Sequence, residues 1–147
     1  MSGATSAIPV AEGMAHITND EVLALAGNTL AHFCHQAARN AGWWADIRTG
    51  APLDPFSDKN LVLAKLALVH SEVSEAVEGH RKGRDDDHLP GRLSIEVELA
   101  DAVIRIADLC GALGLDLGGA ISEKMAYNAG RVDHSIAHRQ AVGGKAV

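Results

Sequence analysis

Four acidic residues are the clearest sign of chemistry in this sequence of 147 residues. Glu72 and Glu75 form one pair, Glu98 and Asp101 form another, and the members of each pair lie three positions apart. Residues at this spacing share one face of an α-helix, so each pair would present two carboxylates in the same direction. Hard divalent cations prefer oxygen ligands of this kind. If two helices bring the pairs together, we expect a Mg²⁺ site, with Mn²⁺ as a substitute ion.

The surroundings of the second pair favour a bound cation. The segment around it is apolar in nearly every direction about a helix axis, and Glu98, Asp101, Arg105 and Asp108 form its single polar stripe. Carboxylates in such surroundings must be neutralised by protonation, by a basic residue or by a cation. Arg105 could pair with Asp101 or Asp108, but one guanidinium cannot balance four converging carboxylates. The alternative is that the acids lie on solvent-exposed helix faces and bind nothing.

Four helices are expected to position these residues. Thr18 to Glu21 has the form of a capping box, which predicts a helix that runs to about Ala41. The second helix should follow Asp58 and end near Lys82, the third should end at Gly111 to Gly114, and the fourth should span Asp116 to about Arg131. Residues 42–57 and 83–91 are expected as loops, and no segment has the alternating pattern of a strand. The predicted fold is all-α and similar to a four-helix bundle.

The composition, 47% hydrophobic and 22% charged, is typical of one domain. We expect a helical domain over residues 18–133, a flexible N-terminal arm over 1–17 and a flexible C-terminal tail over 134–147. A third helix that is apolar on all sides needs more cover than one small chain offers. The sequence therefore predicts a homo-oligomer, either a dimer or a tetramer, with helices paired across its interface.

Charge and hydropathy limit the possible partners. The formal net charge is −6, which disfavours binding to a nucleic acid polymer. No early apolar stretch is long enough for a signal segment or a membrane span, so a cytoplasmic protein without a membrane partner is expected. Cys34 and Cys110 stand alone in the sequence and are expected to be buried free thiols.

A longer motif carries a resemblance to a known family. Glu72-Val-Ser-Glu75 is followed after 22 residues by Glu98-Leu-Ala-Asp101, and then by Lys124-Met-Ala-Tyr127-Asn128-Ala-Gly-Arg131. In this order the motif resembles the MazG-like all-α nucleotide pyrophosphohydrolases, a superfamily that includes dimeric dUTPases and phosphoribosyl-ATP pyrophosphohydrolase. The match covers roughly residues 30–131. The resemblance implies an oligomeric helical bundle that binds Mg²⁺ and splits a nucleoside triphosphate into monophosphate and pyrophosphate, with nucleotide-pool house-cleaning as its role.

The resemblance also implies roles for individual residues. Glu72, Glu75, Glu98 and Asp101 would coordinate the metal, and Glu75, or else Glu72, would position or deprotonate the attacking water. The polar stripe of Lys124, Asn128 and Arg131, with Tyr127 beside it, would bind the phosphates. Lys124 and Arg131 could instead only stabilise a helix end. Lys65, seven residues before Glu72, either reaches the phosphates or balances the acids.

One of the two residues Trp43 and Trp44 is expected to touch the nucleobase, because a flat ring offers a stacking surface. The alternative is that they pack in the core. His32 and Gln36 could hydrogen-bond to base edges, although a surface or structural role is favoured for His32. Two other functions remain possible at this point: phosphoribosyl-ATP pyrophosphohydrolase of histidine synthesis, and a non-catalytic helical oligomerisation or regulatory module whose acids bind no metal.

Overall fold

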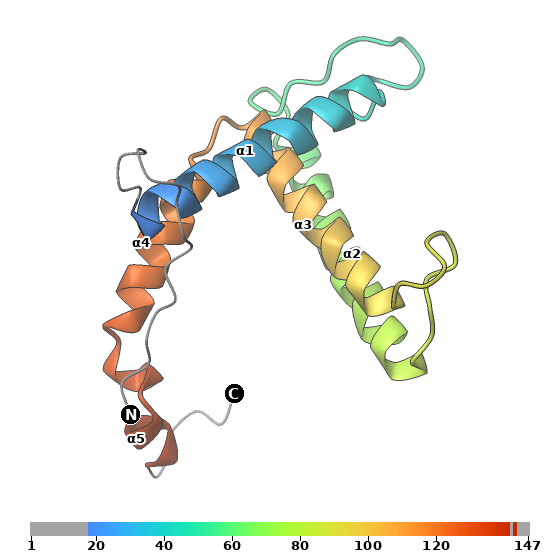
Figure 1. Cartoon of the computed structure of the whole chain (residues 1–147). Coiled ribbons are helices and arrows are strands. Elements are labelled where there is room, and N and C mark those ends of the chain that lie inside the picture. Colours follow the sequence, from blue (N-terminus) through green and yellow to red (C-terminus); the bar gives the residue numbers. More distant parts are fainter. Residues whose placement is uncertain (1–17, 142, 144–147) are drawn as a thin grey trace, which may run out of the picture.

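The computed structural model describes residues 18–141 and residue 143, and in this part of the chain it is all-helical (Figure 1). The helices are α1 (Asn19–Asn40), α2 (Lys59–Lys82), α3 (Ser94–Ala112), α4 (Leu117–Ala129) and the short α5 (Ile136–Gln140), with a 3-10 turn η1 (Val132–His134) before α5. The predicted all-α class is confirmed, and the four predicted helices form. The fourth is shorter than expected, and α5 forms within the predicted tail. The N-terminal arm predicted at 1–17 lies outside the described residues.

Local capping explains where these helices begin. The predicted capping box is present, since the Glu21 N–H donates to Thr18 Oγ1 at 3.2 Å and the Thr18 N–H donates to Glu21 Oε2 at 2.8 Å. Asp58 accepts from the Asn60 N–H at 2.9 Å, and Asp116 accepts from the Gly119 N–H at 2.9 Å. The starts of α1, α2 and α4 are therefore encoded by residues next to them in sequence.

Two arms extend from α1, as Figure 1 shows. One arm is the antiparallel pair α2 and α3, and the other is α4 followed by α5. The long α1 packs against α3 and α4, while α2 packs against α3. The four long helices therefore do not close into a bundle within one chain.

Glycine residues allow the helices to approach closely at these contacts. A Cβ atom on Gly118 of α4 would lie 2.0 Å from the Ala24 carbonyl oxygen of α1. On the other arm, a Cβ atom on Gly79 of α2 would lie 2.5 Å from Ser94 Oγ at the start of α3. A larger side chain at either position would force the two helices apart.

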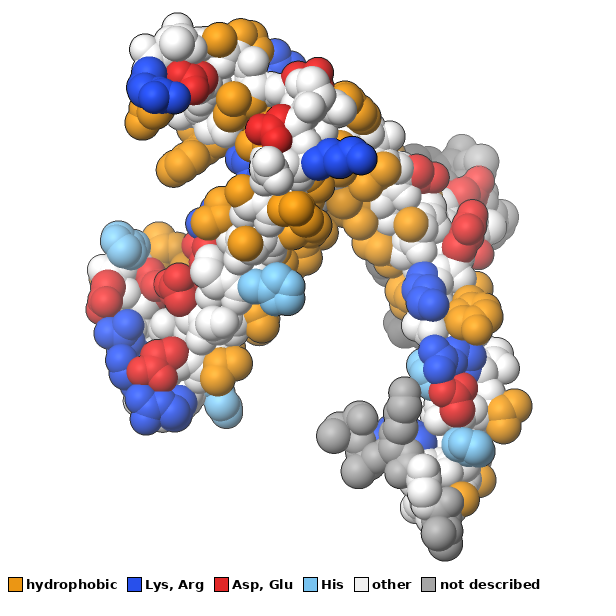
Figure 2. Space-filling view, turned by 180° about the vertical axis from the view of Figure 1, so that it is seen from behind, with side chains coloured by type: hydrophobic (Ala, Val, Ile, Leu, Met, Phe, Trp, Pro, Cys, Tyr) orange, Lys and Arg blue, Asp and Glu red, His pale blue; other side chains and the backbone are white. Residues whose placement is uncertain are grey.

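The chain buries mainly small apolar side chains and leaves many large ones exposed. The buried apolar residues are Ala31, Trp44, Ala76, Ala102, Ala107 and Leu109. Exposed large residues follow α2 and α3, and Figure 2 shows hydrophobic side chains at the surface of both arms. The exposed set on the first arm comprises Leu63, Leu66, Leu68, Val73 and Val77 of α2 and Leu99, Val103, Ile104 and Ile106 of α3. One chain therefore does not surround α3. None of the described helices has the length and apolar character needed to cross a bilayer.

Candidate functional site

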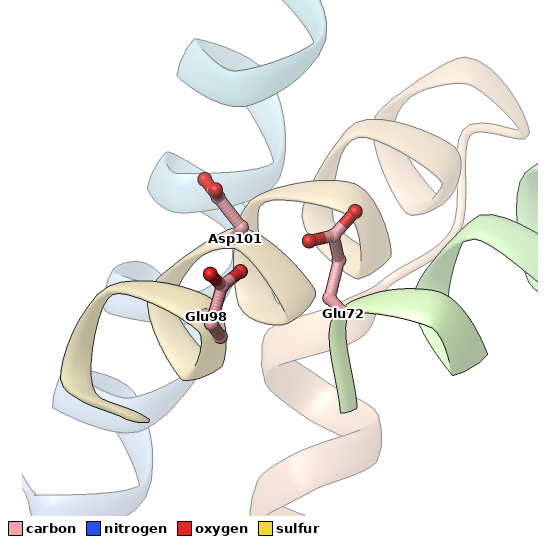
Figure 3. Close-up of side chains that lie close together, drawn as sticks. All are labelled: Glu72, Glu98 and Asp101. Atoms are coloured by element: carbon pink, nitrogen blue, oxygen red, sulfur yellow. The ribbon is translucent and has the colours of Figure 1, made fainter. Parts of the chain in front are cut away.

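Three of the four predicted acids meet between α2 and α3. Glu72, Glu98 and Asp101 each offer a carboxylate oxygen, and these three oxygens lie within 4.8 Å of one another (Figure 3). Glu72 is buried, while Glu98 and Asp101 are half-buried. We call these three residues the acid cluster. Two pairs that are separated in sequence therefore converge because α2 and α3 pack side by side.

Helix packing decides which acid of the first pair joins the cluster. The face of α2 that is buried carries Glu72, Ala76 and Gly79, which follow one another at helical spacings of four and three. Gly79 on this face touches Ser94 at the start of α3. Glu75 lies off this face and is exposed, so it stands beside the acid cluster and is not part of it.

Like charges meet at the acid cluster. Burial raises the pKa of the Glu98 carboxyl above its ordinary value, and the negative charges of Glu75, Glu72, Asp101 and Asp86 raise it further. The charge of Glu75 contributes to the raised pKa of Glu98, so the exposed Glu75 carboxylate is close enough to Glu98 to repel its charge. The ionised cluster is therefore a place where added positive charge is stabilising.

The geometry of the acid cluster fits a hard divalent cation. Oxygen ligands bind Mg²⁺ at about 2.0–2.1 Å and Ca²⁺ at about 2.3–2.6 Å, so two ligands of one ion are separated by at most about 4–5 Å. The three oxygens of the acid cluster lie within 4.8 Å of one another, which is inside the limit of about 5 Å for Ca²⁺. Mg²⁺, with a limit of about 4 Å, requires small side-chain movements that draw the carboxylates closer. All donors are carboxylate oxygens, which suits Mg²⁺ or Mn²⁺ better than a softer metal.

Arg105 contacts the acid cluster, but not through the partner expected from sequence. Its Nε atom lies 2.5 Å from Glu72 Oε1 across the α2–α3 contact, and no ion pair with Asp101 or Asp108 forms. The same Nε is buried and makes no hydrogen bond. The contact is thus an ion pair without the aligned N–H direction of a hydrogen bond. Sequence spacing suggested partners on the same helix, whereas packing supplies one from the neighbouring helix.

The last acid of the polar stripe organises a second polar cluster. Asp108 is buried, and its Oδ1 accepts from Trp44 Nε1 at 2.7 Å and lies 2.9 Å from His35 Nδ1. Lys65 Nζ lies 3.7 Å from Asp108 Oδ2, 3.2 Å from the Trp43 carbonyl oxygen and 4.3 Å from the centre of the Trp44 ring. Lys65 therefore pairs with an acid, but this acid is Asp108 and not one of the four predicted metal ligands.

This second cluster was missed as a structural unit by sequence reasoning. The position of Asp108 on the polar stripe of α3 was the one available signal, because burial of an aspartate requires donors from other elements. Those donors come from α1, α2 and the loop after α1. Asp108 thereby ties the 42–57 loop to the helices.

A pocket of about 330 Å³ opens between α1, α2 and α3, next to the acid cluster. Its lining includes small apolar residues of α1, together with Asp101 of the cluster and Arg105. The full lining comprises Cys34, Ala37, Ala38, Ala41, Trp43, Lys65, Leu68, Asp101, Ile104, Arg105 and Asp108. A mostly apolar lining with a few polar groups is typical of small-molecule sites.

The two tryptophans have different environments. Trp43 lines the pocket and is 70% exposed, so its ring is accessible to a ligand. Trp44 is 6% exposed and its indole N–H is taken by Asp108, which matches the core-packing alternative. His32 and Gln36 line a different hollow, together with His35, Arg39 and Asn40. The structure therefore does not bring these two predicted base-binding residues to the pocket that Trp43 lines.

The two cysteines are free and half-buried, so they are less buried than expected. Burial raises the pKa of both thiols, and the charge of Asp108 raises that of Cys34 further. A raised thiol pKa lowers the thiolate fraction and hence the reactivity of the group.

The predicted phosphate-binding residues lie on the other arm. Lys124 Nζ is 4.6 Å from the centre of the Tyr127 ring, and the Arg131 guanidinium carbon is 6.0 Å from it. Arg131 is also paired with Asp133, with Nη2 2.5 Å from Asp133 Oδ2. Asn128 Oδ1 is buried without a hydrogen-bond partner. Lys124, Tyr127 and Asn128 lie on α4, whereas Arg131 lies just beyond its end, because the helix stops two residues earlier than predicted. Within one chain the α4 arm diverges from the α2–α3 arm that carries the acid cluster (Figure 1).

Comparison of the chain with models of protein families, with curated proteins and with solved structures found no match. The features of the chain that bear on function are therefore the acid cluster, the pocket beside it and the surfaces that one chain leaves open.

Proposed function

We propose that the protein is a Mg²⁺-dependent hydrolase that converts (deoxy)nucleoside triphosphates to monophosphate and pyrophosphate. The observation that supports this most directly is the shared border of the acid cluster and the pocket, where Asp101 belongs to both. A pocket lined by apolar residues suits a base and sugar, and an acid cluster beside it that could bind a cation suits the phosphate chain. The motif resemblance to MazG-like pyrophosphohydrolases supports the same reaction and a role in nucleotide-pool house-cleaning.

The proposed chemistry divides among the residues by position. Glu72, Glu98 and Asp101 would hold the cation, which neutralises phosphate charge and orients the phosphate chain when bound. Glu75 is exposed beside the acid cluster, where its carboxylate can accept a proton from a water that attacks the α-phosphorus. Trp43 and the small residues of α1 would contact the base. Asp108 would hold Lys65 and the loop that carries Trp43 in place.

We further propose that the working unit is a homo-oligomer. The apolar side chains left exposed on α2 and α3 form a surface of the kind that marks protein–protein contact. Lys124, Asn128 and Arg131 cannot serve the acid cluster of their own chain while the arms diverge as they do. A second copy packed against α2 and α3 would cover the apolar surface and supply an α4 arm to the phosphates.

Nucleotide hydrolysis by the purified protein tests the proposal. The full chain is incubated with each common dNTP and NTP, and with phosphoribosyl-ATP, with and without Mg²⁺, and the products are separated by ion-exchange chromatography. Equal amounts of monophosphate and pyrophosphate that appear only with Mg²⁺ would support the proposal. Preference for phosphoribosyl-ATP would favour the histidine-synthesis alternative. No cation-dependent product with any substrate would favour the non-catalytic module.

A matched pair of variants tests the site. Glu98→Gln removes one charge from the acid cluster and should lower turnover by about a hundredfold or more, since loss of a metal ligand removes both binding and orientation. Glu96→Gln removes the same charge two residues away on α3, where the side chain is exposed and pairs with Arg92. Glu96→Gln should hydrolyse nucleotides like the unmodified protein. Equal turnover of both variants would refute the site assignment.

A further inference from the structure

Arg105 is placed between the two halves of the proposed site. It follows Asp101 by four residues on α3, so both side chains lie on one face of that helix. Its guanidinium contacts Glu72 of the acid cluster, and its side chain also lines the pocket. The Arg105 side chain is 39% exposed whereas Glu72 is 6% exposed, so part of the arginine reaches solvent while the carboxylate lies between the helices.

The Arg105 contact with Glu72 is poorly formed for an arginine. A guanidinium carries five N–H donors in a planar fork, and its strongest pairing with an oxyanion uses two parallel hydrogen bonds. Here the approaching atom is Nε, and this atom is buried without making any hydrogen bond. A contact of this kind compensates part of the charge of Glu72 but gives up the hydrogen bonds that would make it tight. A better acceptor within reach would draw the guanidinium away.

Resting on the proposed function, we propose that Arg105 is an exchangeable counter-ion that couples cation binding to phosphate binding. Without ligands it neutralises Glu72. When Glu72 turns to a divalent cation, Arg105 is released to the pocket side and binds the phosphate chain of the nucleotide through its fork of donors. Arg105 thus opposes cation binding while no ligand is present, and it favours nucleotide binding once the cation is bound. Arg105 is therefore a proposed substrate-binding residue, and Glu72, Glu98 and Asp101 remain the proposed ligands of the cation.

This arrangement has a thermodynamic consequence. If Arg105 leaves Glu72 when the cation binds, the cation and the phosphate chain assist each other's binding, and the two effects must be equal in size. Nucleotide without cation would bind weakly, because Arg105 would have to abandon a buried carboxylate. The site would therefore favour the cation–nucleotide complex over either component alone.

Isothermal titration calorimetry on Arg105→Gln tests the proposal without measuring turnover. Mn²⁺ titrated into the ligand-free full-length variant should bind about three- to tenfold more tightly than to the unmodified protein, because an ion pair with a partly exposed member opposes binding by no more than about that factor. Pyrophosphate titrated in the presence of saturating Mn²⁺ should bind at least tenfold more weakly. Arg105→Lys keeps the positive charge, so its Mn²⁺ affinity should return to the weaker value of the unmodified protein. Its pyrophosphate affinity should recover only in part, because lysine lacks the fork of donors.

The controls separate this role from general charge effects and from a structural role. Arg81→Gln removes one positive charge from the exposed end of α2, where Arg81 pairs with Glu78, and should change neither affinity. If Arg105 only ties α2 to α3, Arg105→Gln should weaken Mn²⁺ binding or leave it unchanged, and that result would overturn the proposal. Equal changes in Arg81→Gln and Arg105→Gln would also overturn it. Failure of the unmodified protein to bind Mn²⁺ at all would instead refute the proposed function.

Discussion

The crossing of α1 and α4 gives a sharp test of the fold, because backbone meets backbone there. A Cβ atom added at Gly118 would lie 2.0 Å from the Ala24 carbonyl oxygen and 2.7 Å from Ala24 Cα. Real contacts of Cβ atoms essentially never fall below 3.0 Å, so Gly118→Ala must separate the helices by about 1 Å. The separation also stretches two hydrogen bonds of Asn28, which accepts from the Gly118 N–H at 2.9 Å and donates to Asp116 at 2.7 Å.

The size of the effect follows from three contributions. Overpacking costs about 1–3 kcal/mol, and weakening two hydrogen bonds costs roughly 1 kcal/mol more. Alanine recovers up to about 1 kcal/mol relative to glycine in a helix. We therefore expect Gly118→Ala to lower the free energy of unfolding by about 1–3 kcal/mol, which corresponds to a fall in Tm of roughly 3–10 °C for a chain of this size.

Thermal unfolding followed by circular dichroism at fixed protein concentration measures this effect. Gly130→Ala is the matched control, because the nearest atom to its added Cβ is the Tyr127 carbonyl oxygen at 3.6 Å, an ordinary contact. This control should change the free energy of unfolding by no more than about 0.5 kcal/mol. If Gly118→Ala unfolds at the same temperature as Gly130→Ala, the close crossing of α1 and α4 does not exist and the reasoning is wrong.

Three further predictions concern the polar clusters. Asp108→Asn should lower the free energy of unfolding by about 1–3 kcal/mol in urea titrations, because Trp44, His35 and Lys65 lose a buried anion; unchanged stability would contradict the assigned role. Trp44→Phe should cost about 1 kcal/mol through its lost indole N–H, whereas Trp43→Phe, at an exposed ring, should leave stability nearly unchanged. Because the pKa of Glu98 is raised, the folded state holds the Glu98 proton more tightly than the unfolded state does. This stabilises the metal-free protein at pH values below the ordinary glutamate pKa, and the stabilisation is lost as the pH rises through the pKa of Glu98 in the folded state. Glu98→Gln should therefore raise the Tm of the metal-free protein at pH 7 but not at pH 4. Saturating Mg²⁺ should raise the Tm of the unmodified protein but not that of Glu98→Gln.

Much of the local structure follows from neighbouring residues. The capping box at Thr18 and Glu21, and the side chains of Asp58 and Asp116, predicted where three helices begin, because an N-cap is satisfied within its own first turn. The i, i+3 spacing of the acids likewise predicted that each pair would share one face of its helix. These signals, together with the absence of segments with the alternating pattern of a strand, were enough to predict the all-α class.

The tertiary structure decided which side chains meet, because this depends on how the helices are rotated about their axes and how closely they approach. Packing of the face that carries Gly79 against Ser94 turned Glu72 toward α3 and left Glu75 outside. The same packing gave Arg105 a partner on the other helix, and the fold of the 42–57 loop buried Trp44 while exposing Trp43. These outcomes could not be predicted from spacing, because spacing defines a face only relative to its own helix axis. The direction in which that face points is set by contacts between residues far apart in sequence.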